Sequence, residues 1–193
     1  MLGLKLPTDP RWVNIVEKNI DEILIDHAYC EQKAASTAIS LIVSFPEYTE
    51  LVEEMIALSR EEMGHFKMVH DRIIARGIVL GRDRKDEYVV ELLKFFPKGG
   101  SRTNQLVHRL LYAGLIEARS CERFRLLSEE LEDKELAEFY HKLMVSEAGH
   151  YTMFLKFARK YGNREEVDKK WEDLLAYEAQ IMKNLGKKKS IHG

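Results

Sequence analysis

The composition of this 193-residue chain is typical of a single helix-rich globular domain, with 45% hydrophobic and 32% charged residues. The net charge of -2 gives no general argument for nucleic-acid binding, although a local basic patch is compatible with it. Two cysteines, Cys30 and Cys121, make a disulfide framework a poor explanation and favour a reducing cytoplasm. We read no signal peptide and no membrane span in the sequence, so a cytoplasmic protein without membrane attachment is expected.

Four prolines divide the chain and predict where long helices can form. They are Pro7, Pro10, Pro46 and Pro97. A proline inside a helix costs about 3 kcal/mol, so long proline-free stretches with helical periodicity are helix candidates. The sequence predicts bundle helices at about 11–44, 47–76, 104–131 and 133–161, with Gly77 ending the second and Gly162 the fourth.

The connections between these helices predict the fold class. The joints near residues 45–47 and 132–133 are short, so each helix pair should form an antiparallel hairpin. The long segment 77–103 contains a short predicted helix at about 86–96, and a long crossover between two hairpins is typical of ferritin-like bundles. A further helix at about 165–185 should stop at Gly186 and leave a frayed basic end. We therefore expect an all-α, ferritin-like four-helix bundle that forms one domain over residues 1–193.

A seven-residue repeat carries the predicted chemistry. Segments 62–68 and 147–153 align without gaps and share Glu, Gly, His and Met, with an aromatic residue at the fifth position. Glu and His three residues apart lie on the same face of a helix and can bind one ion. Two such helices can hold a pair of metal ions when two neighbouring helices supply further carboxylates.

Two further glutamates occur at matching places before the repeat. Glu31 precedes Glu62 by 31 residues, and Glu117 precedes Glu147 by 30 residues. Each lies within a predicted helix among small residues, and the small residue one turn earlier, Ala28 or Gly114, could leave room beside a metal. The predicted metal ligands are therefore Glu31, Glu62, His65, Glu117, Glu147 and His150.

A single Glu-x-x-His pair would be weak evidence, because roughly 0.8 such pairs are expected by chance in this composition. A third pair, Glu138 and His141, has no counterpart in the first half of the chain. His141 also lies nine residues before His150, about half a turn away in angle. We expect this pair to lie on another helix face.

Several neighbouring residues allow weaker interpretations. Gly64 and Gly149 occupy the same position of the motif. A glycine inside a helix costs about 1 kcal/mol relative to Ala, and close helix packing or space near the site would explain why both are present. His27, one turn before Glu31, is better interpreted as a supporting or core histidine than as a ligand. Cys121 is interpreted as a small buried residue, and Asp26 as a possible acceptor that orients an imidazole.

The predicted donor set indicates the class of metal but not the reaction. Carboxylates and imidazoles suit iron or manganese better than copper, and a structural zinc site more often contains thiolate. Iron in a site of this kind commonly has open coordination positions that react with dioxygen. An oxygenase, a ferroxidase, a peroxidase and a manganese catalase all remain compatible with the spacing, as does a helical binding module with a purely structural metal.

Segments 26–38, 59–65, 116–124 and 146–151 resemble the bacterial tRNA 2-methylthio-N6-isopentenyladenosine hydroxylase family. The resemblance extends from the first through the fourth predicted helix, and the strings at 30–38 and 117–124 are more specific than the Glu-x-x-His pairs. Gln32 stands where a second lysine is expected. The resemblance implies a non-haem di-iron monooxygenase that hydroxylates the isopentenyl group of a hypermodified adenosine next to the tRNA anticodon, using dioxygen and two electrons. It places Glu31, Glu62 and His65 on one side of the two iron ions, and Glu117, Glu147 and His150 on the other.

The same resemblance implies a tRNA substrate and an external source of two electrons, for which we expect an electron-transfer reductase. We also expect a monomer. A tRNA-binding surface needs cations that face phosphate. Arg119 and Arg123 are candidates near the pocket, and the surface candidates are Arg82, Arg84, Lys85, Arg102, Lys187, Lys188 and Lys189. The main alternative is a ferroxidase or peroxide-handling protein of the same fold.

Overall fold

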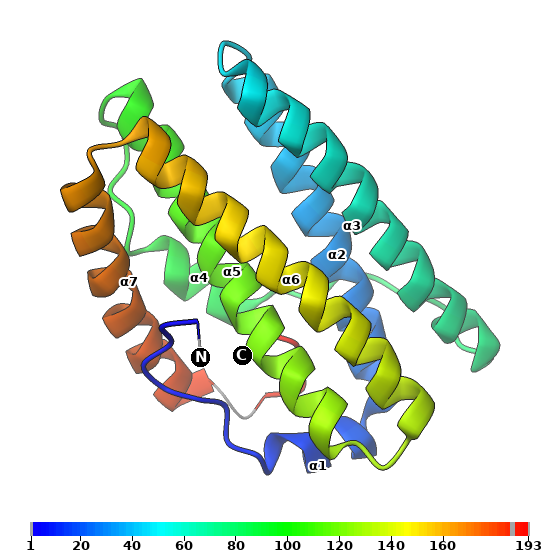
Figure 1. Ribbon diagram of the computed structural model, residues 1–193. Coiled ribbons are helices and arrows are strands. Elements are labelled where there is room, and N and C mark those ends of the chain that lie inside the picture. Colours follow the sequence, from blue (N-terminus) through cyan, green and yellow to red (C-terminus); the bar gives the residue numbers. More distant parts are fainter. Residues whose placement is uncertain (1, 186–187, 193) are drawn as a thin grey trace. The chain divides into compact units, whose positions relative to one another are not determined.

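The computed structural model describes residues 2–185 and 188–192, and all regular secondary structure in this part of the chain is helical (Figure 1). It separates into two compact units. The α2–α3 unit comprises residues 18–85 and 189–191, and the α5–α6 unit comprises the remaining segments. The expectation of one domain over the whole chain stays a prediction. The helices are α1 (Trp12–Lys18), α2 (Ile20–Ser44), α3 (Thr49–Ala75), α4 (Glu87–Leu93), α5 (Arg102–Glu130), α6 (Lys134–Tyr161) and α7 (Arg164–Leu185).

The α2–α3 unit is an antiparallel helix hairpin with a short joint, as predicted (Figure 1). Buried residues recur along each helix mainly at intervals of three and four residues, which keeps them on one stripe. On α2 this stripe includes Ala28, Glu31 and Ala35, and on α3 it includes Glu62 and His65. The predicted ligands therefore occupy positions that helical periodicity otherwise gives to apolar core residues.

The α5–α6 unit contains the second predicted hairpin, in which α5 and α6 pack along each other (Figure 1). Side chains cap both helices: Ser101 Oγ accepts a hydrogen bond from the backbone N–H of Asn104, and Asp133 Oδ1 accepts one from Leu136, each at 3.1 Å. Helix α7 also packs against this hairpin and against α4.

Glycines end two helices where the sequence predicts it. Gly77 follows α3 with a φ of +73°, a left-handed conformation that glycine adopts without strain. Gly162 follows α6, and a Cβ there would lie 2.7 Å from Val167 and 2.8 Å from Val107. Both contacts are to Cγ2 methyl groups, which lie near the valine backbones and have little freedom to move away. Close packing therefore selects glycine at this helix end.

Two helical segments differ from their predicted bounds. The stretch predicted as one helix at 11–44 is divided at Asn19, whose backbone has φ -138° and ψ 32°. The carbonyl of Asn19 accepts the first backbone hydrogen bond of α2, from Ile23 at 3.0 Å, so a new helix starts after this break. Helix α4 covers Glu87–Leu93 rather than 86–96. Asp86 caps its start by accepting a hydrogen bond from Val89 at 3.1 Å, and after Leu93 the chain continues in tighter turns, in which residues 94–96 donate to carbonyls three residues earlier.

The prediction of a frayed basic end is wrong for residues 188–192, whereas Gly186 and Lys187 lie outside the described residues. Ile191 is fully buried and its backbone N–H donates to Asp26 Oδ2 at 2.7 Å. His192 is also buried, where its ring stacks on Tyr88 and its Nε2 lies 3.0 Å from Ser120 Oγ. The side chains of Ile191 and His192 therefore anchor this tail, although its lysines had suggested a frayed end.

Each helix in the described part of the chain is too short or too polar to cross a membrane.

Candidate metal centre

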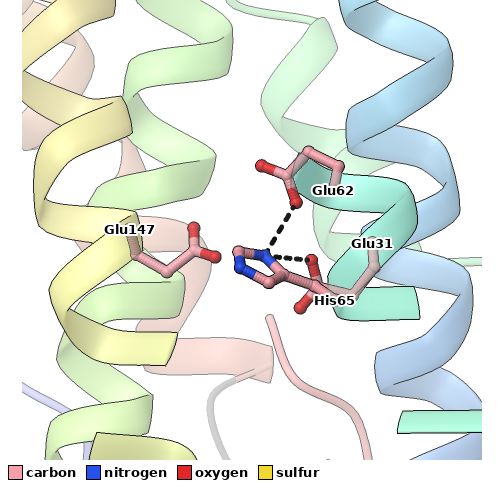
Figure 2. A group of neighbouring side chains, drawn as sticks. All are labelled: Glu31, Glu62, His65 and Glu147. Carbon is pink, nitrogen blue, oxygen red and sulfur yellow. Dashed lines mark ion pairs between the residues drawn. The ribbon is translucent and has the colours of Figure 1, made fainter. Parts of the chain in front are cut away.

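The α2–α3 unit brings together three predicted ligands, Glu31 from α2 and Glu62 and His65 from α3. His65 Nδ1 lies 3.4 Å from Glu62 Oε2 and 3.6 Å from Glu31 Oε2, as the dashed lines in Figure 2 show. All three side chains are buried. We call this cluster of Glu31, Glu62 and His65 the first half-site.

Charge interactions in the first half-site stabilise an ionised carboxylate beside a protonated imidazole. Burial alone would raise the pKa of Glu31, but hydrogen bonds with His27 and His65 outweigh burial and lower it. Burial alone would lower the pKa of His65, but hydrogen bonds with Glu31 and Glu62 and their negative charges raise it to about 10. In the metal-free protein a proton on His65 therefore supplies positive charge next to these carboxylates.

The α5–α6 unit brings together the other three predicted ligands, Glu117 from α5 and Glu147 and His150 from α6. His150 Nδ1 lies 4.0 Å from Glu117 Oε2 and 4.0 Å from Glu147 Oε2. All three side chains are buried, and Figure 2 draws Glu147 on its helix. We call this cluster of Glu117, Glu147 and His150 the second half-site.

The geometry of each half-site fits the binding of a metal ion. Nitrogen and oxygen ligands lie about 2.0–2.2 Å from such an ion, so two ligands of one ion can be at most about 4.4 Å apart. The four ligand separations of 3.4, 3.6, 4.0 and 4.0 Å all satisfy this limit. Two carboxylates and one imidazole per half-site form a hard, oxygen-rich donor set that suits iron or manganese. The use of all six residues in one centre stays a prediction.

His27 supports the first half-site through Glu31. Its Nε2 lies 2.6 Å from Glu31 Oε1, one helical turn away, and the ring is fully buried. The corresponding position of the second half-site, four residues before Glu117, is Ala113. The structure therefore favours the interpretation of His27 as a supporting histidine and reveals a difference between the two half-sites.

Other candidates near the repeat have structural contacts. The thiol of Cys121 is buried, which raises its pKa to about 11, and it donates to the carbonyl of Met144 at 3.4 Å. Asp26 accepts a hydrogen bond from the C-terminal tail at Ile191. Glu138 and His141 are exposed on α6, where Glu138 pairs with Lys142 at 2.9 Å. The prediction that His141 lies away from the metal ligands is confirmed by its exposure.

The glycines of the repeat are not explained by close helix packing. Gly64 and Gly149 are both exposed, and an added Cβ at either position would meet no heavy atom of the described residues within 4 Å. By contrast, a Cβ at Gly114 would lie 3.4 Å from Phe154. Gly114 thus permits close packing of α5 on α6, a role that differs from the predicted space beside a metal.

The interpretation of Arg119 and Arg123 as tRNA-contacting cations near a pocket is wrong, because both side chains are fully buried. Arg119 binds Glu178 at 2.6 Å and Glu122 at 3.0 Å. The guanidinium of Arg123 lies 4.3 Å from the ring centroid of Trp12. These arginines hold the core of the α5–α6 unit together and cannot face phosphate.

Sequence reasoning missed the buried acids that accompany these arginines. Glu122 also accepts hydrogen bonds from Thr8, and Glu178 accepts one from Tyr88 at 3.2 Å. Glu178 had a detectable signal, since it lies on the apolar stripe of α7 between Leu174 and Ile181. Burial raises the pKa of Glu178 despite the opposing charge of Arg119.

Comparisons with known proteins agree with this helical fold. The chain is 33% identical to a solved structure described as protein 43 with aldehyde deformylating oxygenase activity from Synechococcus; the match has a TM-score of 0.90 and covers 98% of this chain and 95% of that one. The predicted all-α, ferritin-like fold class is confirmed.

Two curated relatives carry the name tRNA 2-(methylsulfanyl)-N(6)-isopentenyladenosine(37) hydroxylase. The relative from Pseudomonas putida is 35% identical over 189 residues, which is 98% of this chain and 91% of the relative. The relative from Salmonella typhimurium is 28% identical, with 81% of this chain and 75% of the relative covered. Residues 2–193 match the family described as tRNA-(MS[2]IO[6]A)-hydroxylase (MiaE), and the chain therefore belongs to this family, as its sequence motifs predicted.

Proposed function

We propose that this protein is an oxygen-dependent di-iron hydroxylase that acts on the isopentenyl group of 2-methylthio-N6-isopentenyladenosine next to the tRNA anticodon. The observation that carries the proposal is the pair of buried half-sites, each with two carboxylates and one imidazole, in a chain of this family. The names of the two curated relatives support the choice of substrate.

The proposed iron ligands are the six half-site residues. Bound iron would supply the activation of dioxygen. The chain itself contributes ionised carboxylates, since the pKa of Glu31 is lowered by His27 and His65. His27 holds Glu31 in a fixed orientation through the 2.6 Å contact. Burial of every half-site residue keeps bulk water away from the reacting groups.

The stoichiometry of the reaction defines the partners that we propose. Insertion of one oxygen atom into a C–H bond, with the other leaving as water, consumes dioxygen, two electrons and two protons. We therefore propose an electron-transfer reductase as the external donor. A monomer in the cytoplasm, where tRNA and reductants are available, completes the proposal.

The direct test uses anaerobically iron-loaded protein with a chemical reductant and tRNA that carries the prenylated adenosine. After dioxygen is admitted, mass spectrometry of the nucleosides should show the gain of one oxygen on the modified adenosine. A protein with two bound irons that adds no oxygen under these conditions would refute the hydroxylase assignment.

Two matched variants test the ligand set. Glu117→Ala removes one half-site carboxylate and should lower the iron stoichiometry and abolish hydroxylation. His141→Ala changes an exposed residue of α6 and should leave both unchanged. Equal iron content in the Glu117→Ala variant and the unmodified protein would contradict the proposed centre.

The Synechococcus structure suggests a second candidate activity, because it is 33% identical to this chain and is described as having aldehyde deformylating oxygenase activity. The same reduced, iron-loaded protein can be given an aliphatic aldehyde and assayed for the product that lacks the formyl carbon. Turnover of the aldehyde without turnover of prenylated tRNA would favour this alternative.

A further inference from the structure

A basic segment of the crossover lies along the outside of α2 and is fixed there by side-chain contacts. We call residues 79–85 the crossover strap. Tyr29 Oη donates to the carbonyl of Gly81 at 2.7 Å, and Lys33 Nζ lies 2.7 Å from Asp83. Arg84 binds both the carboxylate and the backbone carbonyl of Glu22 at 3.1 Å. The strap is therefore held in place although residues 81–85 are exposed.

The residues that anchor the strap lie on one side of α2, away from the metal ligand of that helix. Glu22, Tyr29 and Lys33 are separated by seven and four residues, so they form a single stripe. Glu31 is two residues from Tyr29 and from Lys33, which rotates its side chain by about 200° at 3.6 residues per turn. A change on the strap can therefore be made without touching the first half-site.

The acids around the strap already interact within the α2–α3 unit. Asp21 pairs with Arg76 at 2.5 Å, and Glu22 has Lys189 at 3.8 Å in addition to Arg84. Asp83 pairs with Lys33, and Asp26 accepts the backbone N–H of Ile191. Four acids thus face six cations on a chain whose net charge is -2. The six cations are Lys33, Arg76, Arg82, Arg84, Lys85 and Lys189.

Arg82 and Lys85 carry the surplus positive charge of this surface. Both are exposed, and within the described part of the chain neither has a side-chain partner. They flank the anchored pair Asp83 and Arg84, so their backbone positions are fixed while their charged ends face solvent. A guanidinium can bind a phosphate through two N–H donors, and an ammonium binds it as a point charge.

We propose that the crossover strap, through Arg82 and Lys85, binds the sugar–phosphate backbone of the tRNA substrate; this inference rests on the proposed function. Phosphate contacts position a nucleic acid without reading its sequence. The surface lies on the opposite side of α2 from Glu31, so its role is to hold the substrate and not to take part in the chemistry. Arg84 has a separate role as an anchor of the strap.

The test compares two double variants of equal charge change in the iron-loaded protein. Arg82→Glu with Lys85→Glu reverses the surplus charge of the strap. Lys169→Glu with Lys183→Glu reverses two exposed charges on α7, in the α5–α6 unit. The binding of prenylated tRNA is measured by filter binding over a series of salt concentrations, and iron content is measured in parallel.

We expect the strap variant to bind tRNA at least about tenfold more weakly and to lose about 1.4–1.8 from the slope of log affinity against log salt, because each phosphate contact contributes about 0.7–0.9. The α7 variant should keep both the affinity and the slope, and both variants should keep their iron. Unchanged binding by the strap variant, or equal loss in the α7 variant, would overturn the inference.

The outcomes also separate this inference from the proposed function. Unmodified protein that binds and hydroxylates tRNA, together with a strap variant that matches it, refutes only the role of the strap. Iron-loaded unmodified protein that neither binds nor hydroxylates prenylated tRNA refutes the proposed function, and with it the role of the strap.

Discussion

At the scale of single residues, His27 distinguishes the two half-sites. It contacts Glu31 at 2.6 Å, whereas Ala113 occupies the matching place before Glu117. Residues that orient a metal ligand typically affect metal affinity by about 10–100-fold. We expect His27→Ala to weaken Fe²⁺ binding within this range when measured by anaerobic calorimetry.

His141→Ala is the matched control for His27→Ala, because His141 is an exposed histidine on α6. It should bind iron like the unmodified protein. If His27→Ala also retains full affinity, the contact with Glu31 is structural and has no effect on the metal.

His65 predicts how metal binding depends on pH. Its pKa is raised to about 10 in the metal-free protein, so the ring is protonated at neutral pH. A metal binds only the neutral imidazole, and each proton released makes affinity rise about tenfold per pH unit. We expect the affinity for Mn²⁺ to increase between pH 6.5 and 8.5, and calorimetry in buffers of different ionisation enthalpy should detect proton release.

The raised pKa of His65 also makes the stability of the metal-free protein depend on pH, in the opposite direction to metal affinity. A raised histidine pKa stabilises the folded state fully below the ordinary value of 6.5, and this contribution is lost as pH rises through about 10. High pH should thus favour metal binding while it weakens the apoprotein. Metal affinity independent of pH, with no proton release, would contradict the ion pairs of His65 with Glu31 and Glu62.

At the scale of helices, α5 and α7 are joined by a buried ionic network. Arg119 is fully buried and binds Glu122 on its own helix and Glu178 on α7. Removal of one partner of a buried ion pair leaves an uncompensated charge and typically costs about 3–5 kcal/mol. Arg119→Met should lower the free energy of unfolding by this amount, as measured by urea denaturation.

A surface ion pair supplies the comparison for the Arg119 variant. Lys142 and Glu138 are one turn apart on α6 and exposed, so Lys142→Ala should change the free energy of unfolding far less than Arg119→Met. A double variant, Arg119→Met with Glu178→Gln, should recover part of the loss, because it removes one of the two stranded negative charges. No recovery would mean that lost packing, and not charge, dominates.

At the scale of the whole molecule, the proposed metal ions should stabilise the fold. Each half-site buries two carboxylates, which repel each other unless a cation accompanies them. A ligand that binds only the folded state stabilises it by about 2.7 kcal/mol at a hundredfold excess over its dissociation constant. We expect chelation of the iron to lower the melting temperature, as measured by calorimetry under anaerobic conditions.

A variant with one carboxylate removed from each half-site tests the origin of this stabilisation. Glu62→Ala with Glu147→Ala should reduce the iron-dependent rise in melting temperature strongly, whereas His141→Ala should retain it. An equal rise in all three proteins would indicate that iron binds elsewhere.

The sequence by itself determined the helices, the two hairpins and the six candidate ligands. These features depend on periodicity and spacing, which are properties of neighbouring residues: Glu31, Glu62 and His65 occur at the same intervals as the core residues around them. The repeat then distinguished the candidate ligands from the exposed pair Glu138 and His141.

Only the tertiary structure decided the roles of residues whose partners are far away in the sequence. Arg119 and Arg123 look like surface cations in the sequence, but acids and an aromatic ring from distant segments compensate their burial. Ile191 and His192 follow a run of lysines and are nevertheless buried. Arg82 and Arg84 are both arginines of the same exposed segment, yet only Arg84 is anchored by Glu22. A local pattern fixes which face a residue occupies, whereas its partner, and hence its charge balance and role, depends on contacts that form only when the chain folds.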